Sequence, residues 1–101
     1  MGTSRIQNNQ KQFTNNSKTI EMKIHKLKTW TVYFNEVLLG HKTFEVRKND
    51  RDFKTDDYVI LQEWNNDTQE FTGREIARRI GYILYGGQFG IEDGYCVMQL
   101  N

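Results

Sequence analysis

The chain has 101 residues, of which 37% are hydrophobic and 27% are charged, and its formal net charge is +1. This length suits one compact domain, and the near-neutral charge argues against a protein that grips long duplex DNA through bulk electrostatics. No apolar run approaches the roughly 18 residues of a membrane span, no signal-peptide segment is recognisable, and the single Cys96 cannot form an internal disulfide. We therefore expect a soluble, cytoplasmic monomer.

The first part of the chain differs in composition from the rest. Residues 1–21 are rich in Asn, Gln, Ser, Thr and Lys, and their apolar residues are too scattered to form one face. A segment of this kind cannot bury enough apolar surface to offset the entropy lost on ordering it. We therefore expect a disordered tail at residues 1–21 and one folded domain at residues 22–101.

The folded part is predicted to begin with a strand and a helix. Residues 22–28 alternate imperfectly between apolar residues and lysines, which is typical of a strand with one wet face. Thr29 is expected to cap a helix over residues 30–39, in which apolar residues such as Phe34 recur at helical spacing. Gly40 can supply the left-handed conformation that ends the helix.

A charged stretch follows the predicted helix. Because alternate side chains of a strand point to opposite faces, Phe44 and Val46 are expected to enter the core, and Glu45 and Arg47 to share the other face. Lys42 has the parity of Phe44, but a bulge where the chain leaves the helix would turn it towards the charged face. The plain structural interpretation is a solvated strand edge with a surface ion pair, worth about 0 to 1 kcal/mol.

The remainder is predicted to consist of strands joined by turns. Apolar or alternating runs indicate three further strands, with a polar turn and a glycine-rich loop between them: residues 58–64, 65–68 (turn), 71–84, 86–90 (loop) and 95–100. The long middle strand is expected to bend near Gly73 or Gly81. Cys96 is expected to be a small core residue.

The charged stretch also carries a recognisable motif. Gly40, Lys42, Glu45 and Arg47 fill the four fixed positions of the signature G-x-K-x-x-E-x-R. In this the chain resembles the ASCH domain, a small barrel related to the PUA RNA-binding fold. The resemblance implies an α+β fold: a small PUA-like β-barrel of about five to six strands, with one main helix after the first strand.

Three other segments carry a second resemblance: residues 22–28 with Trp30, residues 49–53 and residues 86–91. They are similar to a small bacterial ASCH-like family of unassigned function, domain of unknown function 3850, so that the resemblance extends over residues 22–101. ASCH-like domains usually place Gly at the turn position occupied here by Asp56. Because Asp tolerates left-handed torsions, we expect the turn to be kept.

The first functional hypothesis is a module that binds RNA or a nucleotide, the ligand class that the resemblance implies. Its binding residues would be Lys42, Glu45, Arg47 and Gly40, in a cleft between the helix and the strand that follows it. Lys42 and Arg47 would meet phosphate or base oxygens. Glu45 would accept a hydrogen bond from an exocyclic amine or hold Arg47 in place.

Charge and aromatic residues bear on this hypothesis. Residues 22–48 hold six basic and two acidic residues, whereas residues 49–101 hold five and ten, a distribution that suits a short anionic ligand. Trp64 or Phe89 is the candidate for stacking on a nucleobase. The sequence predicts that Trp30 and Tyr33 instead pack in the core or against the helix.

The second hypothesis is a hydrolase that acts on a modified nucleoside or on RNA, with Lys42 and Glu45 as candidate catalytic residues. Some small bacterial ASCH-like proteins hydrolyse the amide of N4-acylcytidine with a Lys, a Thr nucleophile and a Glu. Lys42 matches their lysine, but Glu45 stands at the position of their threonine. This difference argues against that mechanism, although Glu45 could activate water as a general base.

The third hypothesis is a protein-interaction module or a toxin-associated accessory domain without a small ligand. His25 and His41 are isolated from other potential ligands, so no metal site is expected, and no cofactor is expected either.

Overall fold

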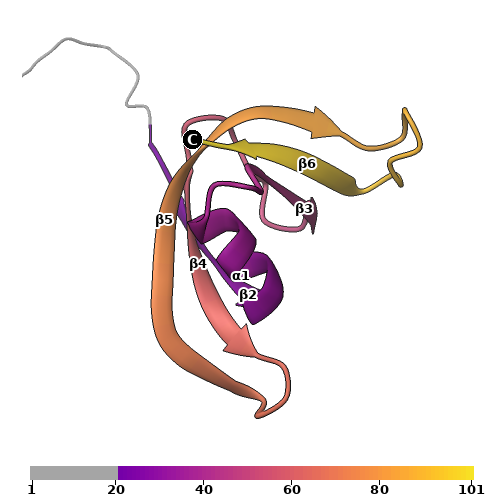
Figure 1. Ribbon diagram of the computed structural model, residues 1–101. Helices are drawn as coiled ribbons and strands as arrows, with labels where there is room; N and C mark the ends of the chain where they lie inside the picture. The colour runs from indigo at the N-terminus through magenta and orange to yellow at the C-terminus, as the bar shows by residue number, and fades with distance from the viewer. Residues whose placement is uncertain (1–20) are drawn as a thin grey trace, which may run out of the picture.

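The computed structural model describes residues 21–101, so the tail expected at residues 1–21 lies, apart from Glu21, outside the described residues. The described part holds five strands and one helix in the order β2 (Ile24–Trp30), α1 (Thr31–Leu38), β3 (Phe44–Lys48), β4 (Tyr58–Asn65), β5 (Glu70–Tyr85) and β6 (Tyr95–Leu100) (Figure 1). Within residues 21–101, no helix has the length and apolar character needed to cross a membrane.

The five strands form one mixed sheet in the order β2-β4-β5-β6-β3. β2 and β4 are parallel, and the other three pairs are antiparallel. The long β5 pairs first with β4 and then with β6, and it curves so that the sheet wraps around α1 (Figure 1). The two ladders of β5 shift register beside Gly73 and at Gly81, so an irregularity occurs at both glycines where a bend was predicted.

The sheet is open in the described residues, because no backbone ladder joins its edge strands β2 and β3. The structure is thus a small, mostly stranded domain with one short helix, and the predicted closure into a barrel is not observed. Two arginine side chains bridge the gap instead. Arg47 Nη2 lies 2.8 Å from the carbonyl oxygen of Lys28, and Arg51 Nη1 lies 2.6 Å from that of Lys26. We call this junction of β2 with β3 and the loop after it the seam.

The helix begins directly after β2, which differs from the predicted boundary. Thr29 is the last buried residue of the strand, and its hydroxyl donates to the carbonyl of Leu27 rather than capping the helix. The N-cap position is Trp30, which makes no side-chain capping hydrogen bond. The predicted end is confirmed, since Gly40 has a φ of 80° and its N–H donates to the carbonyl of Val37.

A buried carboxylate anchors the start of β2. Asp57 accepts hydrogen bonds from His25 Nε2 at 2.8 Å and from the backbone N–H groups of Lys23 and Lys54. Burial alone would raise the pKa of Asp57, but these hydrogen bonds outweigh it and lower the pKa. The preceding Asp56 has a φ of 77°, so the turn keeps its left-handed residue without glycine, as predicted.

The faces of β3 are the reverse of the prediction. Phe44 and Val46 are 45% and 52% exposed, whereas Glu45 is only 4% exposed. The reason is the register with β6, in which Glu45 pairs with Met98 and Arg47 pairs with Cys96. Both partners are fully buried, so this face of β3 looks towards the core. The predicted entry of Phe44 and Val46 into the core is therefore wrong.

The core fills the space between the curved sheet and α1. The helix contributes two fully buried side chains, Phe34 and Val37. The other buried apolar residues come from the strands and from the loop before β4: Leu27, Phe53, Val59, Leu61, Ile76, Ile80, Ile83, Cys96, Met98 and Leu100. The predicted core position of Cys96 is confirmed, and burial raises the pKa of its thiol.

One substitution made at two valines tests the orientation of β3. Val46→Thr should change the free energy of unfolding by less than about 0.5 kcal/mol, because the new hydroxyl meets water. Val59→Thr in β4 is the matched control and should cost about 1 to 3 kcal/mol, because Val59 is fully buried and the hydroxyl would lack a partner. Urea unfolding followed by tryptophan fluorescence measures both. Equal losses would show that Val46 lies in the core after all.

Candidate functional site

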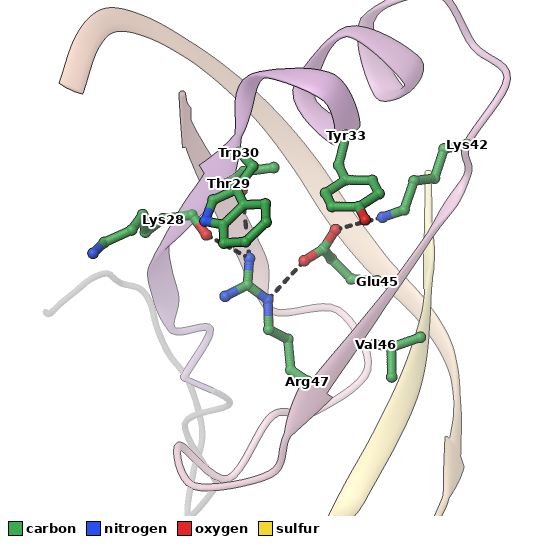
Figure 2. Close-up of a pocket in the computed structure, with 8 residues that line it drawn as sticks. All are labelled: Lys28, Thr29, Trp30, Tyr33, Lys42, Glu45, Val46 and Arg47. Atoms are coloured by element: carbon green, nitrogen blue, oxygen red, sulfur yellow. Dashed lines mark hydrogen bonds and ion pairs between the residues drawn. The ribbon is translucent and has the colours of Figure 1, made fainter. Parts of the chain in front are cut away.

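A hollow of about 530 Å³ lies between the end of β2, the first turn of α1 and the strand β3 (Figure 2). This volume is within the range of about 300 to 1,000 Å³ that small-molecule sites occupy. Eight residues line it: Lys28, Thr29, Trp30, Tyr33, Lys42, Glu45, Val46 and Arg47. The hollow thus contains three of the four residues proposed from the sequence as ligand-binding residues.

A buried carboxylate paired with two cations forms one wall. Glu45 Oε1 accepts a hydrogen bond from Lys42 Nζ at 2.8 Å, and Glu45 Oε2 accepts one from Arg47 Nε at 2.7 Å. Figure 2 shows the two cations on opposite sides of the Glu45 carboxylate. Burying a carboxylate is costly unless its oxygens are paired, and here each oxygen is. The trio, defined as Lys42, Glu45 and Arg47, carries a net charge of +1.

Lys42 can contact Glu45 because it precedes β3. Its side chain is therefore not subject to the alternation of side-chain directions along the strand. The chain leaves α1 through Gly40, and β3 begins only at Phe44. Lys42 Nζ also donates to the carbonyl of Phe44 at 2.8 Å. Lys42 therefore lies on the face of Glu45, the arrangement that a non-strand torsion before β3 was expected to allow.

Gly40 lies apart from the other motif residues. It ends the helix and is not among the residues that line the hollow. In the structure, Gly40 serves to end α1 through its left-handed conformation. A contact between Gly40 and a ligand stays a prediction.

Arg47 connects the trio to the seam. Its Nε binds Glu45, and its Nη2 donates to the Lys28 carbonyl at 2.8 Å and lies 3.4 Å from the Thr29 hydroxyl. These contacts come from two different strands, so the guanidinium is held in one orientation. The terminal Nη1 has no hydrogen-bond partner among residues 21–101, which leaves two N–H donors for a ligand.

Two aromatic side chains stand beside the trio. Trp30 and Tyr33 are 47% and 49% exposed, and their rings stack with centroids 6.4 Å apart and planes at 23°. The predicted core position of the two rings is therefore wrong, whereas packing against the helix is observed for Trp30, which stacks on Tyr33 of α1. Helical spacing does not reveal this exposure, because Tyr33 lies four residues before the buried Val37 and therefore beside it on the helix surface.

The aromatic residues proposed from the sequence lie elsewhere. Trp64 packs edge to face on Phe71 with ring centroids 4.9 Å apart, and Lys28 Nζ lies 4.1 Å from its ring. Phe89 is in the loop between β5 and β6. Neither Trp64 nor Phe89 lines the hollow.

The arrangement can bind a planar polar group. The half-exposed aromatic rings offer surface for stacking, and the cations of the trio offer N–H donors. The single excess positive charge of the trio favours a ligand with oxygen acceptors. Within residues 21–101, no three His, Cys, Asp or Glu side chains lie together in a group that could hold a metal ion.

A separate ion pair braces the helix that carries Tyr33. Arg74 Nε lies 2.7 Å from Glu63 Oε1, and Arg74 Nη2 donates to the side-chain oxygen of Asn35 in α1 at 2.9 Å. Hydrogen bonds from Arg74 and from the Thr72 hydroxyl lower the pKa of the buried Glu63 to about 2. The hairpin of β4 and β5 is thus fastened to α1 through one guanidinium.

Two comparisons with known proteins show what this chain is similar to. The model of a family described as a domain of unknown function (DUF3850) matches residues 24–100. A protein of Escherichia phage P2, described as an uncharacterized 12.9 kDa protein in the GpA 3′ region, is 45% identical over 58 residues. That alignment covers 57% of this chain and 51% of the relative, so the chain matches about half the length of the phage protein.

Glu63 should make stability depend on acid pH. Its folded pKa of about 2 lies below the ordinary 4.5, so the ionised group stabilises the fold above about pH 4.5, and this contribution is lost as the pH falls from 4.5 towards 2. In urea unfolding between pH 2 and pH 7, the stability difference between wild type and Glu63→Gln should be largest near neutrality and shrink across that window. Arg74→Gln should flatten the same slope. A difference that does not vary with pH would contradict this assignment.

Proposed function

This chain belongs to the DUF3850 family, and from that premise we propose that it is a module that binds a nucleotide or short single-stranded RNA in the hollow between α1, β2 and β3. The family description names no activity, so the proposal rests on the site. The observation that carries it is the pairing of a stacking surface, Trp30 with Tyr33, with the donors of the Lys42, Glu45 and Arg47 trio.

Stacking favours a nucleobase over an aliphatic ligand. Base stacking on an aromatic side chain is worth about 1 to 3 kcal/mol and works for every base, because every base has a π face. Trp30 and Tyr33 are half-exposed at the hollow, so their faces are accessible without displacing core residues. The aromatic pair therefore favours a ligand that contains a planar ring.

The trio favours a base edge over a simple anion. Glu45 neutralises one of the two cations, and an ammonium and a guanidinium that share one carboxylate attract an isolated phosphate less than two unpaired cations would. The remaining donors of Lys42 and Arg47 suit carbonyl or ring-nitrogen acceptors, and the buried Glu45 holds both cations in place. RNA recognition of this kind reads the edges of unstacked bases.

The same residues support a relation to the ASCH and PUA-like domains. Three of the four signature residues, Lys42, Glu45 and Arg47, converge on one hollow. We infer that the curved, open sheet is a PUA-like barrel whose last junction, the seam, is made by arginine side chains instead of a backbone ladder. Because of this relation, we propose an RNA-related ligand for this chain as well.

Binding is favoured over hydrolysis at this site. A general base must lie within hydrogen-bonding reach of the water or substrate proton that it removes. Both oxygens of Glu45 already accept from cations, and the Thr29 hydroxyl donates to the Leu27 carbonyl rather than to a base. The candidate catalytic pair of Lys42 and Glu45 is therefore better explained as part of a binding surface.

Variants matched by residue type test the proposal. Calorimetric titration with ribonucleosides, their 5′-monophosphates and a mixed-sequence five-nucleotide RNA should reveal binding that Tyr33→Ala weakens by about 1 to 3 kcal/mol, since a stacking surface is lost. Lys42→Ala should weaken it by about 1 to 3 kcal/mol, since a charged hydrogen bond is lost. The controls are Tyr82→Ala and Lys54→Ala, which alter exposed residues that do not line the hollow.

Three results would contradict the proposal. No binding by any probe would favour a protein-interaction module. Equal losses of affinity from Tyr33→Ala and Tyr82→Ala would show that Tyr33 does not stack on the ligand. Release of cytidine from N4-acetylcytidine, abolished by Lys42→Ala, would make the site catalytic and would replace binding with hydrolysis as its function.

A further inference from the structure

A second, smaller hollow adjoins the first at Arg47. Its volume is about 180 Å³, below the range of about 300 to 1,000 Å³ that whole small-molecule ligands occupy. It is lined by Leu27, Arg47, Lys48, Asp50, Arg51 and Phe53. Arg47 lines both hollows, so the two spaces share this residue. A space of this size suits one compact group of a ligand whose larger part lies next door.

The charges around the second hollow are mostly positive. Its charged lining residues are three cations, Arg47, Lys48 and Arg51, and one carboxylate, Asp50. The Asp50 side chain is exposed and lies 4.0 Å from Arg51 Nε. In the described part of the chain, Lys48 has no carboxylate within ion-pairing distance. Local charge therefore favours an anion here, in contrast to the larger hollow, where Glu45 offsets part of the positive charge.

The guanidinium groups at this hollow are held before any ligand arrives. Arg51 Nη1 donates to the Lys26 carbonyl at 2.6 Å, and Arg47 Nη2 donates to the Lys28 carbonyl at 2.8 Å. These carbonyls are two residues apart on β2, which corresponds to about 7 Å along a strand. Arg51 is held through Nη1, so its other N–H groups can be directed to a phosphate, whereas Arg47 is held through both Nε and Nη2 and offers Nη1. Because both side chains are already restrained, little side-chain entropy is lost on binding.

Buried apolar residues form the remainder of the lining. Leu27 and Phe53 are almost fully buried. They belong to the core that backs the hollow, and charge interactions are stronger near a low-dielectric interior than in open water. The site thus combines positioned cations with the edge of the core, which exposed lysines on a flat surface do not provide.

We propose that this second hollow is a phosphate subsite, formed by Arg47, Lys48 and Arg51, that receives the phosphate of a nucleotide whose base lies in the larger hollow. The inference rests on the proposed function and makes it more specific: the ligand is a nucleoside phosphate or the phosphodiester of RNA, not a free nucleoside. Arg47 is the residue shared by the base and the phosphate.

The test compares ligands that differ only in the phosphate. Full-length protein is titrated calorimetrically with each ribonucleoside, its 5′-monophosphate and its 3′-monophosphate, and with inorganic phosphate alone. At least one monophosphate should bind about tenfold more tightly than its nucleoside, as expected for one charge-assisted hydrogen bond. Raising the salt concentration from 50 to 200 mM should reduce this advantage, whereas nucleoside binding should change little.

Two variants locate the effect at the second hollow. Lys48→Gln and Arg51→Gln should each reduce the advantage of the monophosphate at least threefold and leave nucleoside affinity unchanged. Lys48→Gln is the safer variant, because Lys48 makes no hydrogen bond to the seam, whereas Arg51 does. The matched control is Lys54→Gln, which removes an exposed lysine that is paired with Asp52 and lines neither hollow.

The outcomes separate this inference from the proposed function. If nucleosides bind and the phosphate adds less than twofold, or if its advantage survives Lys48→Gln and Arg51→Gln, the subsite is refuted and the base hollow stands. If monophosphates and inorganic phosphate bind alike in a manner that depends on Lys48, while nucleosides do not bind, the anion subsite stands and the base hollow is refuted. If none of these probes binds, both are refuted.

Discussion

The geometry of the larger hollow depends on one buried carboxylate. Glu45 is withdrawn from water, which is tolerable only because Lys42 and Arg47 each donate to one of its oxygens. The same contacts restrain two long side chains that would otherwise sample many rotamers, and they set the two cations at a fixed separation. A structural requirement, the pairing of a buried charge, thereby arranges donors beside an aromatic surface.

Arg47 extends this arrangement to the architecture of the sheet. β2 and β3 are the two edges of the sheet, and unpaired edge carbonyls invite association with other chains. Arg47 and Arg51 donate to the carbonyls of Lys28 and Lys26, so that side chains occupy part of this edge. A continuous ladder would hold the two strands at about 4.8 Å, whereas arginine side chains span a wider gap. Space for both hollows therefore exists at the place where the sheet does not close.

Local patterns in the sequence predicted the features whose causes are local. The strand that precedes the helix, the irregular strand marked by Gly73 and Gly81, the helix end at Gly40 and the left-handed torsion at Asp56 all follow from the conformational preferences of a few adjacent residues. The departure of Lys42 from strand parity was predictable for the same reason, since it lies between the helix and the strand. Closure of the sheet into a barrel was predicted from the resemblance to ASCH domains. The seam between β2 and β3 is open, so the order of the strands does not by itself close the sheet.

Sequence by itself therefore determined the elements of this protein and the residues of the charged motif, whereas tertiary structure decided which way they face. Alternation shows that Glu45 and Val46 point to opposite faces, but it does not say which face meets the core; the register of β3 against the buried Cys96 and Met98 decides that. The exposure of Trp30 was likewise decided by where β2 ends and α1 begins. These outcomes required long-range contacts, because burial is a property of what a side chain packs against and not of its neighbours in the chain.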